Sequence, residues 1–237
     1  MKIALVTGVT GGIGRELAVA LLREGYFVVG VARNLEKLKE MKNKLGERFE
    51  FLVADLLRQG SSEKVAEGLR DLGIERLDVL VNNAGYGLRK PLIKHSPEEL
   101  EGVFKLNALF PVILTRELLP FMGQGSTVVF VISGVAFVNA PELPSYCASK
   151  AALHSMALNL AGELGKLGIS VMRVYPKQVK TDFWDGKVPR GSIGPEKVAR
   201  AIVKGLEAGK SEVFVPGYLK LLKYLPGWPA FTYRFKY

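Results

Sequence analysis

The sequence has little cysteine or histidine: its 237 residues include one cysteine, Cys147, and two histidines. One cysteine cannot form an internal disulfide, which excludes a disulfide scaffold and favours a reducing, cytoplasmic compartment. His95 and His154 have no second type of metal ligand at a usable spacing. We therefore expect no metal site, and ordinary surface or interface positions for both histidines.

Segments that could enter a membrane are also scarce. Arg15 and Glu16 interrupt the place where the apolar core of a signal peptide would lie. The longest stretch without charge, residues 118–141, is as long as a bilayer span, but Pro120 and a turn-like sequence at residues 123–126 divide it. The sequence therefore predicts a buried strand in this stretch and no spanning helix.

The composition is that of a folded globular protein, with 48% hydrophobic and 24% charged residues, and it excludes a disordered or collagen-like chain. The formal net charge is +10, and residues 218–237 contribute four basic residues and no acid. The sequence contains no stripe of alternating basic and aromatic residues, which is the pattern typical of a nucleic-acid platform. We expect no nucleic-acid partner, whereas an anionic cofactor or a lipid surface is compatible with the charge.

Short apolar runs alternate with helical patterns along the chain. The strand-like runs occupy residues 3–6, 27–31, 49–53, 79–81, 127–132, 169–174 and 212–215. Because they lack polar alternation, both faces of their sheet should be covered by helices, which indicates parallel strands with right-handed crossovers. We expect a doubly wound Rossmann-type α/β fold of about seven strands, forming a single domain over residues 1–217 with a tail at residues 218–237.

A glycine-rich turn follows the first predicted strand and precedes a helix. Its candidate cofactor contacts are Gly8, Thr10, Gly11, Gly12, Ile13 and Gly14. Glycines here allow positive φ and let the backbone approach a pyrophosphate, which the helix N-terminus favours. A glycine string alone would fit a tight turn equally well, but its place between strand and helix predicts a dinucleotide site.

Arg33 and Asn34 follow the second predicted strand, where an NAD site would carry an acidic residue. Without that carboxylate a 2′-phosphate is not repelled, and the Arg33 guanidinium offers it paired donors, so NADP(H) is favoured over NAD(H). The alternative is that Arg33 is a solvated surface charge.

Three side chains suggest acid–base chemistry. Lys150 follows Tyr146 by four residues at the start of a helical pattern, so both side chains share one face. An ammonium lowers the pKa of a nearby phenol, which suits Tyr146 to act as a general acid and base. Ser133 ends the fifth predicted strand, at the sheet edge where α/β proteins bind ligands, and could donate a hydrogen bond to a carbonyl oxygen or simply cap the strand.

With these motifs the chain resembles the short-chain dehydrogenase/reductase family, in its compact single-domain form. The family's glycine motif matches Gly8, Gly12 and Gly14, and its Asn-Asn-Ala-Gly motif matches Asn82, Asn83, Ala84 and Gly85. Its active-site residues match Asn107, Ser133, Tyr146 and Lys150, its adenine contact matches Asp55 and the adjoining Leu56, and its pattern after the sixth strand matches Pro176, Val179 and Thr181.

The resemblance implies a division of labour among these residues. Tyr146 would exchange a proton with the substrate oxygen, Ser133 would orient the carbonyl, Lys150 would lower the tyrosine pKa and hold the nicotinamide ribose, and Asn107 would keep a water in the proton relay. Two residues depart from the family pattern. Lys177 replaces the usual glycine after Pro176, and Gly11 stands where NADP-preferring relatives often have a basic residue.

These observations predict an NADP(H)-dependent oxidoreductase for a hydrophobic ketone, aldehyde or secondary alcohol. In the family's layout the pocket would be lined by Val135, Phe137, Val138, Leu143, Phe183 and Trp184. The alternatives are a ketone reductase of lipid metabolism that docks on a membrane through its tail, and a dinucleotide-sensing protein without activity. A helix over residues 151–162 carries no charged residue, which predicts a homodimer or homotetramer.

The tail, residues 218–237, has two possible roles: it folds over a neighbouring subunit or the substrate cleft, or it docks reversibly on anionic lipid. On a helical wheel of about 100° per residue, one side carries Tyr218, Leu219, Leu221, Leu222 and Leu225, and the other carries Lys220 and Lys223. Pro226 then ends the helix, ahead of the Trp228-Pro229 stretch.

Overall fold

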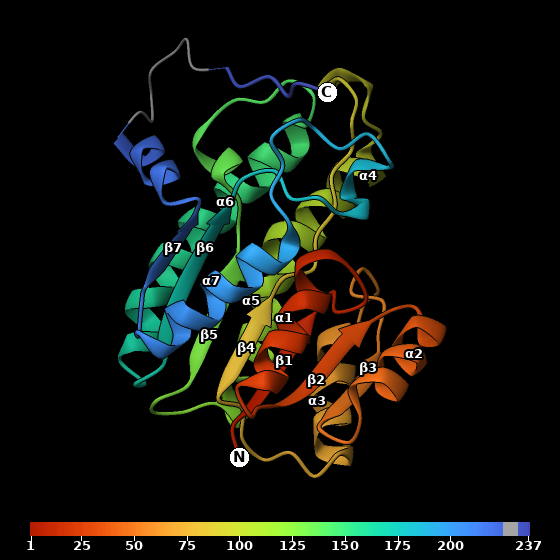
Figure 1. Ribbon diagram of the computed structural model, residues 1–237, viewed down its shortest axis with the longest axis vertical. Coiled ribbons are helices and arrows are strands. Elements are labelled where there is room, and N and C mark those ends of the chain that lie inside the picture. The colour runs from red at the N-terminus through yellow and green to blue at the C-terminus, as the bar shows by residue number, and fades with distance from the viewer. Residues whose placement is uncertain (225–231) are drawn as a thin grey trace.

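The computed structural model describes residues 1–224 and 232–237. Seven strands form one sheet in the order β3-β2-β1-β4-β5-β6-β7, and every neighbouring pair is parallel (Figure 1). The strands are β1 Ile3–Thr7, β2 Phe27–Ala32, β3 Phe49–Val53, β4 Val79–Asn82, β5 Thr127–Val131, β6 Ser170–Pro176 and β7 Glu212–Val215. The predicted fold class and each predicted strand are confirmed, with ends that differ by at most two residues.

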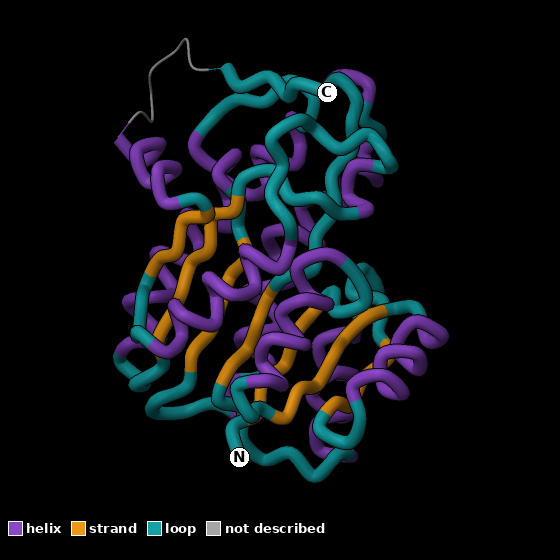
Figure 2. The backbone as a smooth tube through the Cα atoms, viewed as in Figure 1, coloured by secondary structure: helices purple, strands orange, loops and turns teal. Residues whose placement is uncertain are grey.

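Helices cover both faces of the sheet (Figure 2). They are α1 Gly12–Arg23, α2 Leu35–Leu45, α3 Ser61–Asp71, α4 Pro97–Phe104, α5 Phe110–Glu117, α6 Pro144–Gly165 and α7 Pro195–Glu207. Neighbouring strand residues point to opposite faces, so Val6 packs into a core with α1, α2 and α7 while Leu5 packs into a second core with α3, α5 and α6. This double burial explains why the strands lack polar alternation.

Local sequence signals fix the starts of two helices. The Asn34 side chain accepts a hydrogen bond from the Lys37 backbone N–H at 2.9 Å and caps α2. Ser96 and Glu99 form a reciprocal capping box at the start of α4. These caps satisfy backbone donors that the first helical turn leaves unpaired.

The charge-free stretch at residues 118–141 contains the short turn η3 Leu119–Phe121, strand β5 and the 3₁₀ turn η4 Gly134–Phe137. The stretch therefore contains a buried strand and no continuous helix, which confirms the expectation from the sequence. Across the described residues, none of the helices combines the length and the apolar character that crossing a bilayer requires.

The start of the tail, Gly217–Tyr224, forms a 3₁₀ helix, η6, in which residues three apart lie on one ridge. Leu219 and Leu222 face Gly134, where an added Cβ would lie 3.4 and 3.7 Å from their side chains, whereas Tyr218, Leu221 and Tyr224 form an exposed ridge. The helical wheel that placed Tyr218 and Leu221 beside Leu219 and Leu222 is therefore wrong, because it assumed the α-helical repeat.

The two lysines of η6 form a third ridge. Lys223 and Lys220 lie 2.7 and 3.6 Å from the Glu212 carboxylate of β7, which anchors η6 to the edge of the sheet. The expected positions of Leu225, Pro226 and Trp228-Pro229 lie outside the described residues.

Candidate active site

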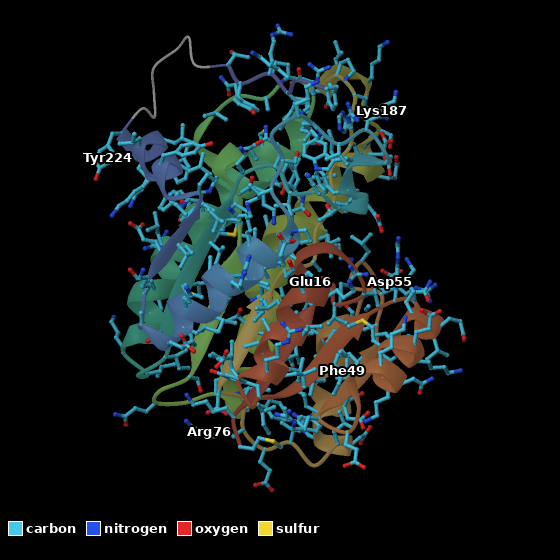
Figure 3. All side chains as sticks on the ribbon, in the orientation of Figure 1. Glu16, Phe49, Asp55, Arg76, Lys187 and Tyr224 are labelled. Carbon is cyan, nitrogen blue, oxygen red and sulfur yellow. The ribbon has the colours of Figure 1, made fainter. Side chains whose placement is uncertain are left out.

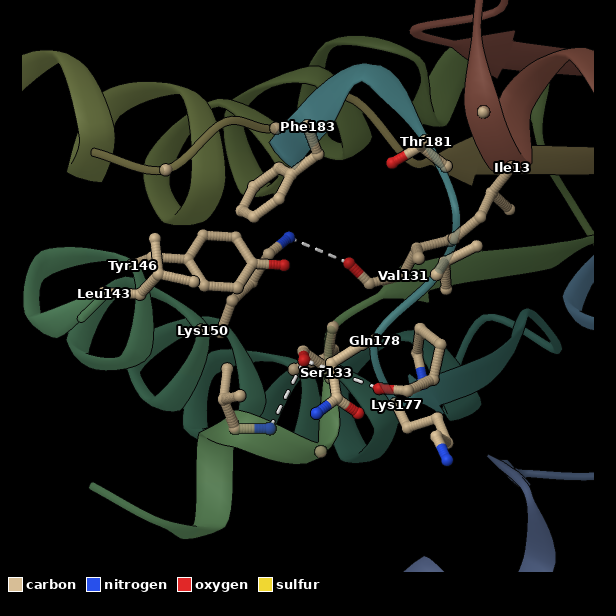
Figure 4. Close-up of a pocket in the computed structure, with 18 of the residues that line it drawn as sticks. Ile13, Val131, Ser133, Leu143, Tyr146, Lys150, Lys177, Gln178, Thr181 and Phe183 are labelled. Carbon is tan, nitrogen blue, oxygen red and sulfur yellow. Dashed lines mark hydrogen bonds between the residues drawn. The ribbon is translucent and has the colours of Figure 1, made fainter. Parts of the chain in front are cut away.

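A cavity of about 750 Å³ opens at the carboxyl edge of the sheet, and Figure 4 shows it at close range. Ile13 and Thr181 lie on one side of it, and Leu143 and Tyr146 lie on the other. The residues of the predicted site that line it are Gly8, Gly11, Gly12, Ile13, Arg33, Asn83, Ala84, Gly85, Ser133, Tyr146, Lys150, Pro176, Val179 and Thr181. Strands β1, β2, β4, β5 and β6 thus end around one space, the place where doubly wound sheets bind ligands.

The remaining predicted residues lie around this cavity without lining it. Thr10 lines an adjoining hollow of about 470 Å³ that also touches Gly11 and Gly12. Asn34 caps α2, and a carboxylate oxygen of Asp55 accepts a hydrogen bond from the Leu57 backbone. Leu56 is buried in the core beneath α3.

The glycine turn has a backbone that only glycine adopts easily. Gly8 and Gly12 have φ of +67° and +51°, in the left-handed region. A Cβ on Gly14 would lie 2.3 Å from the Gly8 carbonyl oxygen, so α1 could not begin so close to β1. These glycines leave an open concave surface at the N-terminus of α1, which fits the pyrophosphate of a dinucleotide.

Thr7 joins this turn to the segment after β4. Its hydroxyl donates to the Val81 carbonyl and accepts hydrogen bonds from the backbone N–H groups of Asn83 and Ala84, at 3.0 and 3.1 Å. The Asn83 side chain donates in turn to the Thr7 carbonyl at 2.9 Å. The two cofactor motifs are therefore one hydrogen-bonded unit, although 76 residues separate Thr7 from Asn83.

Asn107 is fully buried in a π-helical turn, η2 Lys105–Leu109, and does not line the cavity. Its amide oxygen accepts from the Tyr86 backbone N–H at 3.0 Å, and its amide nitrogen donates to the Tyr86 carbonyl and to the Ser149 hydroxyl. Gly85 passes so close that a Cβ would lie 2.9 Å from the Asn107 oxygen. Asn107 thus fixes the loop after β4 against α6.

Tyr146 and Lys150 lie on one face of α6 and both line the cavity, as their spacing predicted. The Lys150 ammonium donates to the Val131 carbonyl at 2.9 Å and lies 5.8 Å from the centre of the Tyr146 ring. Burial lowers the pKa of Lys150 to about 7 and raises the pKa of Tyr146, which the nearby Ser133 hydroxyl pulls back in part. The expected lowering of the Tyr146 pKa by Lys150 is therefore not found, because burial opposes both charged forms and the phenol keeps its proton.

Ser133 follows β5 and is almost fully buried. Its hydroxyl accepts a hydrogen bond from the Val135 backbone N–H at 3.2 Å and lies 3.5 Å from the Pro176 carbonyl (Figure 4). The serine thus caps the η4 turn, one of the two roles that the sequence suggested, and it also lines the cavity.

Aromatic side chains form one wall of the cavity. The Phe183 ring lies 5.0 Å from the Tyr146 ring and 5.1 Å from Trp184, and Trp184 lies 5.0 Å from Phe235. Of the six expected pocket residues five line the cavity, and Phe137 does not. The η4 turn directs Phe137 into the core instead, where it packs on Tyr175.

The tail contributes cavity residues that the family layout did not assign: Tyr218, Leu219, Leu222, Tyr233 and Phe235. Backbone hydrogen bonds hold its end in place, from Tyr233 to Asn139 and from Arg190 to Lys236. The sequence offered folding over the cleft as one of two roles, and the described part of the tail adopts it. Lys177 also lines the cavity, and in Figure 4 its side chain points away from Tyr146.

The expected surface position of the two histidines is wrong for His95. It is buried between the Pro91 carbonyl and the Ser145 hydroxyl, at 3.1 and 2.9 Å, and so ties the loop after β4 to the start of α6. His154 is half-buried and hydrogen-bonds Tyr175 at 2.8 Å. Cys147 is buried, and burial raises the pKa of its thiol to about 11, so the residue packs as a small apolar side chain.

Comparison with known proteins places this geometry in context. Residues 2–190 match the family model described as short chain dehydrogenase. The chain is 33% identical, over 90% of its length and 92% of the relative's, to 3-oxoacyl-(acyl-carrier-protein) reductase FabG of Rickettsia bellii. It is 34% identical, over 81% of its length and 70% of the relative's, to NADPH-dependent 3-dehydrocapnine reductase of Ornithobacterium rhinotracheale.

A solved structure has a closely similar fold. It is an alcohol dehydrogenase from Thermococcus sibiricus complexed with 5-hydroxy-NADP, with a TM-score of 0.82 and 25% identity, over 90% of this chain and 95% of that one. The residues of the predicted site that line the cavity, from Gly8 to Thr181, fall within the matched residues 2–190.

Proposed function

The chain belongs to the short-chain dehydrogenase/reductase family of oxidoreductases acting on CH–OH groups, and on that basis we propose that it interconverts a hydrophobic ketone or aldehyde and its alcohol with NADP(H). The observation that carries this proposal is the convergence of Ser133, Tyr146 and Lys150 on one cavity that also exposes the glycine turn. A pocket of this kind joins a proton donor to a dinucleotide cradle.

The cofactor is held in this proposal by the glycine turn for the pyrophosphate, by residues 83–85 and Val179 around the nicotinamide half, and by Arg33 for the adenosine phosphate. The dinucleotide, when bound, supplies or accepts the hydride. The remaining tasks fall to the chain's own side chains, which must bind, orient and move a proton.

Tyr146 is proposed to be the general acid in reduction. Burial raises its pKa, so the phenol holds its proton until negative charge develops on the substrate oxygen. Ser133 orients that oxygen, and Lys150 supplies positive charge beside the phenolate as it forms. In oxidation the same phenolate removes the proton from the alcohol.

Preference for NADP(H) rests on Arg33, which is exposed, lines the cavity and has no acidic residue beside it in sequence. The names of two similar proteins contain NADPH or an NADP derivative, which supports the same choice. Gly11 adds no side chain to this region, so the phosphate depends on Arg33 more than on the glycine turn.

The substrate is proposed to be apolar next to its carbonyl, because Leu143, Val138 and Phe183 line the cavity beside Tyr146. A second candidate is a ketone of lipid metabolism, since Leu219 and Leu222 of the tail extend this apolar lining. A sensor without activity is disfavoured by the full set of acid–base residues. Action in the cytoplasm and assembly into a homodimer or homotetramer stay predictions.

The direct test is to assay the purified full chain against a panel of carbonyl compounds. Turnover is measured as the rate at which NADPH is oxidised. The panel should vary chain length at constant headgroup, and each ketone should be assayed with NADPH and NADH. We expect kcat/KM to rise with apolar chain length and to be higher with NADPH. No turnover of any ketone, aldehyde or alcohol with either cofactor would contradict the proposal.

A further inference from the structure

Exposed basic and apolar side chains form a surface at the end of the molecule around the cavity, which we call the basic rim. It consists of residues 86–95, 186–191, Gly217–Tyr224 and 232–237. We infer that the basic rim is a docking surface for an anionic lipid bilayer. Docking itself does not depend on the reaction, whereas delivery of a lipid-like ketone from the bilayer to the cavity rests on the proposed function.

Three of the four segments meet although they are distant in sequence, and the fourth, Gly217–Tyr224, lies at the same end of the molecule. Figure 1 places them at the carboxyl edge of the sheet, together with the C-terminus. The Arg89 guanidinium lies 4.5 Å from the centre of the Tyr237 ring, and Arg190 donates a backbone hydrogen bond to Lys236. Tyr224 and Lys187 lie toward the same end of the molecule in Figure 3, on either side of the C-terminal segment.

The four segments of the basic rim carry charge of one sign, whereas Asp185 adjoins residues 186–191 and Glu142 lies near Tyr237. The four segments contain nine lysine and arginine residues and no aspartate or glutamate. Lys90 pairs with Glu99, and Lys220 and Lys223 pair with Glu212. The six others are exposed and form no ion pair within residues 1–224 and 232–237: Arg89, Lys94, Lys187, Arg190, Arg234 and Lys236.

Apolar side chains protrude among these cations. Ile93 is 94% exposed at the tip of the loop after β4, and Leu92 beside it is 52% exposed. On η6, the Leu221 and Tyr224 side chains are 66% and 76% exposed. Exposed aliphatic and aromatic residues next to lysine and arginine are typical of surfaces that insert shallowly between lipid headgroups.

The three ridges of η6 connect this surface to the cavity. Leu221 and Tyr224 are exposed on one ridge, whereas Leu219 and Leu222, on the neighbouring ridge, line the cavity. Glu212 holds the third ridge, formed by Lys220 and Lys223, to the sheet, so the two apolar ridges adjoin directly. An apolar substrate leaving the bilayer at η6 would therefore pass from one leucine ridge to the other without crossing charged side chains.

A bilayer fits this surface better than an acidic protein. Lysine is depleted in protein–protein interfaces, whose apolar residues gather in a buried centre. On the basic rim the apolar tips Ile93 and Leu221 belong to separate segments, with cations beside each. That arrangement suits a fluid surface that accommodates each tip separately.

The test is sedimentation of the full chain with vesicles of phosphatidylcholine alone or mixed with phosphatidylserine. We expect binding to the anionic vesicles at low salt, weaker binding at high salt, and little binding to neutral vesicles. Each basic residue close to an anionic surface strengthens binding about fivefold. The double variant Lys94→Glu, Arg234→Glu should therefore weaken binding at least about twentyfold.

A second variant tests the apolar tips: Ile93→Ser with Leu221→Ser and Tyr224→Ser should weaken binding without changing net charge. These residues do not line the cavity, so turnover of a water-soluble ketone should persist in both variants and report correct folding. The matched control is Lys166→Glu with Leu167→Ser, two exposed residues in the turn before β6 at the opposite edge of the sheet, and it should bind like the unmodified chain.

Failure of the unmodified chain to sediment with anionic vesicles at low salt would overturn the inference. An acidic protein would then be the candidate partner of the basic rim. Equal binding by the control and the rim variants would overturn the inference as well. A rim variant that changes the mass of the protein in light scattering, with no loss of vesicle binding, would assign this surface to a second copy of the chain. None of these results depends on which ketone the enzyme reduces.

Discussion

Lys150 of α6 donates a hydrogen bond from its ammonium group to the carbonyl oxygen of Val131 at the end of β5, 2.9 Å away (Figure 4). This bond satisfies one donor of a lysine that is only 3% exposed. It also directs the charge toward the cavity, beside the ring of Tyr146. Because burial disfavours the charged form of Lys150, this lysine should make the free energy of unfolding depend on pH.

The first prediction follows from the pKa of about 7 for Lys150, against 10.5 for an exposed lysine. Between these values the unfolded chain holds a proton that the folded chain has released, so stability of the unmodified protein rises with pH. The variant Lys150→Met lacks this titrating group, so its stability should not rise in the same way. The difference between its free energy of unfolding and that of the unmodified chain should therefore fall by about 1.4 kcal/mol per pH unit above 7. Urea denaturation at several pH values between 6 and 9 measures it, and a constant difference would show that Lys150 stays protonated in the fold.

Asn107→Ala should destabilise the protein. The substitution leaves the backbone N–H and carbonyl of Tyr86 without their partner in a buried site, at a cost of about 1–3 kcal/mol for each unpaired group. The matched control is Asn159→Ala, which removes an exposed amide that donates to Ser155 one turn earlier on α6, and should stay within about 0.5 kcal/mol. Equal denaturation midpoints for the two variants would refute the anchoring role of Asn107.

Arg33→Asp should narrow or reverse the preference for NADPH. Lost contacts to a charged phosphate are worth about 1.5–3 kcal/mol, or roughly ten- to a hundredfold in the ratio of kcat/KM values. Arg200→Asp makes the same charge change on the exposed side of α7 and should leave the ratio unaltered. Equal kcat/KM for NADPH and NADH in the unmodified chain would contradict the assignment.

The protein should be oligomeric through α6 and its neighbours. Leu158, Leu109 and Ile113 are large apolar side chains with 47%, 45% and 37% of their surface exposed, on or beside a helix whose middle carries no charge. Light scattering at micromolar protein should give a multiple of the 26.0 kDa chain mass, and Leu158→Glu should lower it. A monomeric mass for the unmodified chain would refute this prediction.

Local rules were sufficient for much of the fold and the cavity. Gly8 and Gly12 could be placed because their backbone conformations restrict the residue type, whereas Asn34, expected at the cofactor, caps α2 and does not line the cavity. The shared orientation of Tyr146 and Lys150 follows from the helical repeat alone. Each of these inferences needs only contacts within a few residues.

The misses depend on contacts between distant segments. Phe137 was expected in the pocket, but the η4 turn sends it toward Tyr175, 38 residues further along the chain. His95 is buried and hydrogen-bonds Ser145, 50 residues further along the chain, and η6 is a 3₁₀ helix whose two lysines pair with Glu212. The sequence also assigned the local excess of charge to the tail alone, because only folding brings residues 86–95 and 186–191 beside it.

The measurement that tests the central claim most directly is turnover by Tyr146→Phe, with NADPH binding measured on the same preparation. Removing only the phenolic oxygen should lower kcat about 10²-fold or more for any accepted ketone while leaving NADPH affinity nearly unchanged. Tyr26→Phe, at the start of β2 and outside the cavity, is the matched control and should keep full activity. Turnover by Tyr146→Phe at the rate of the unmodified enzyme would contradict the account.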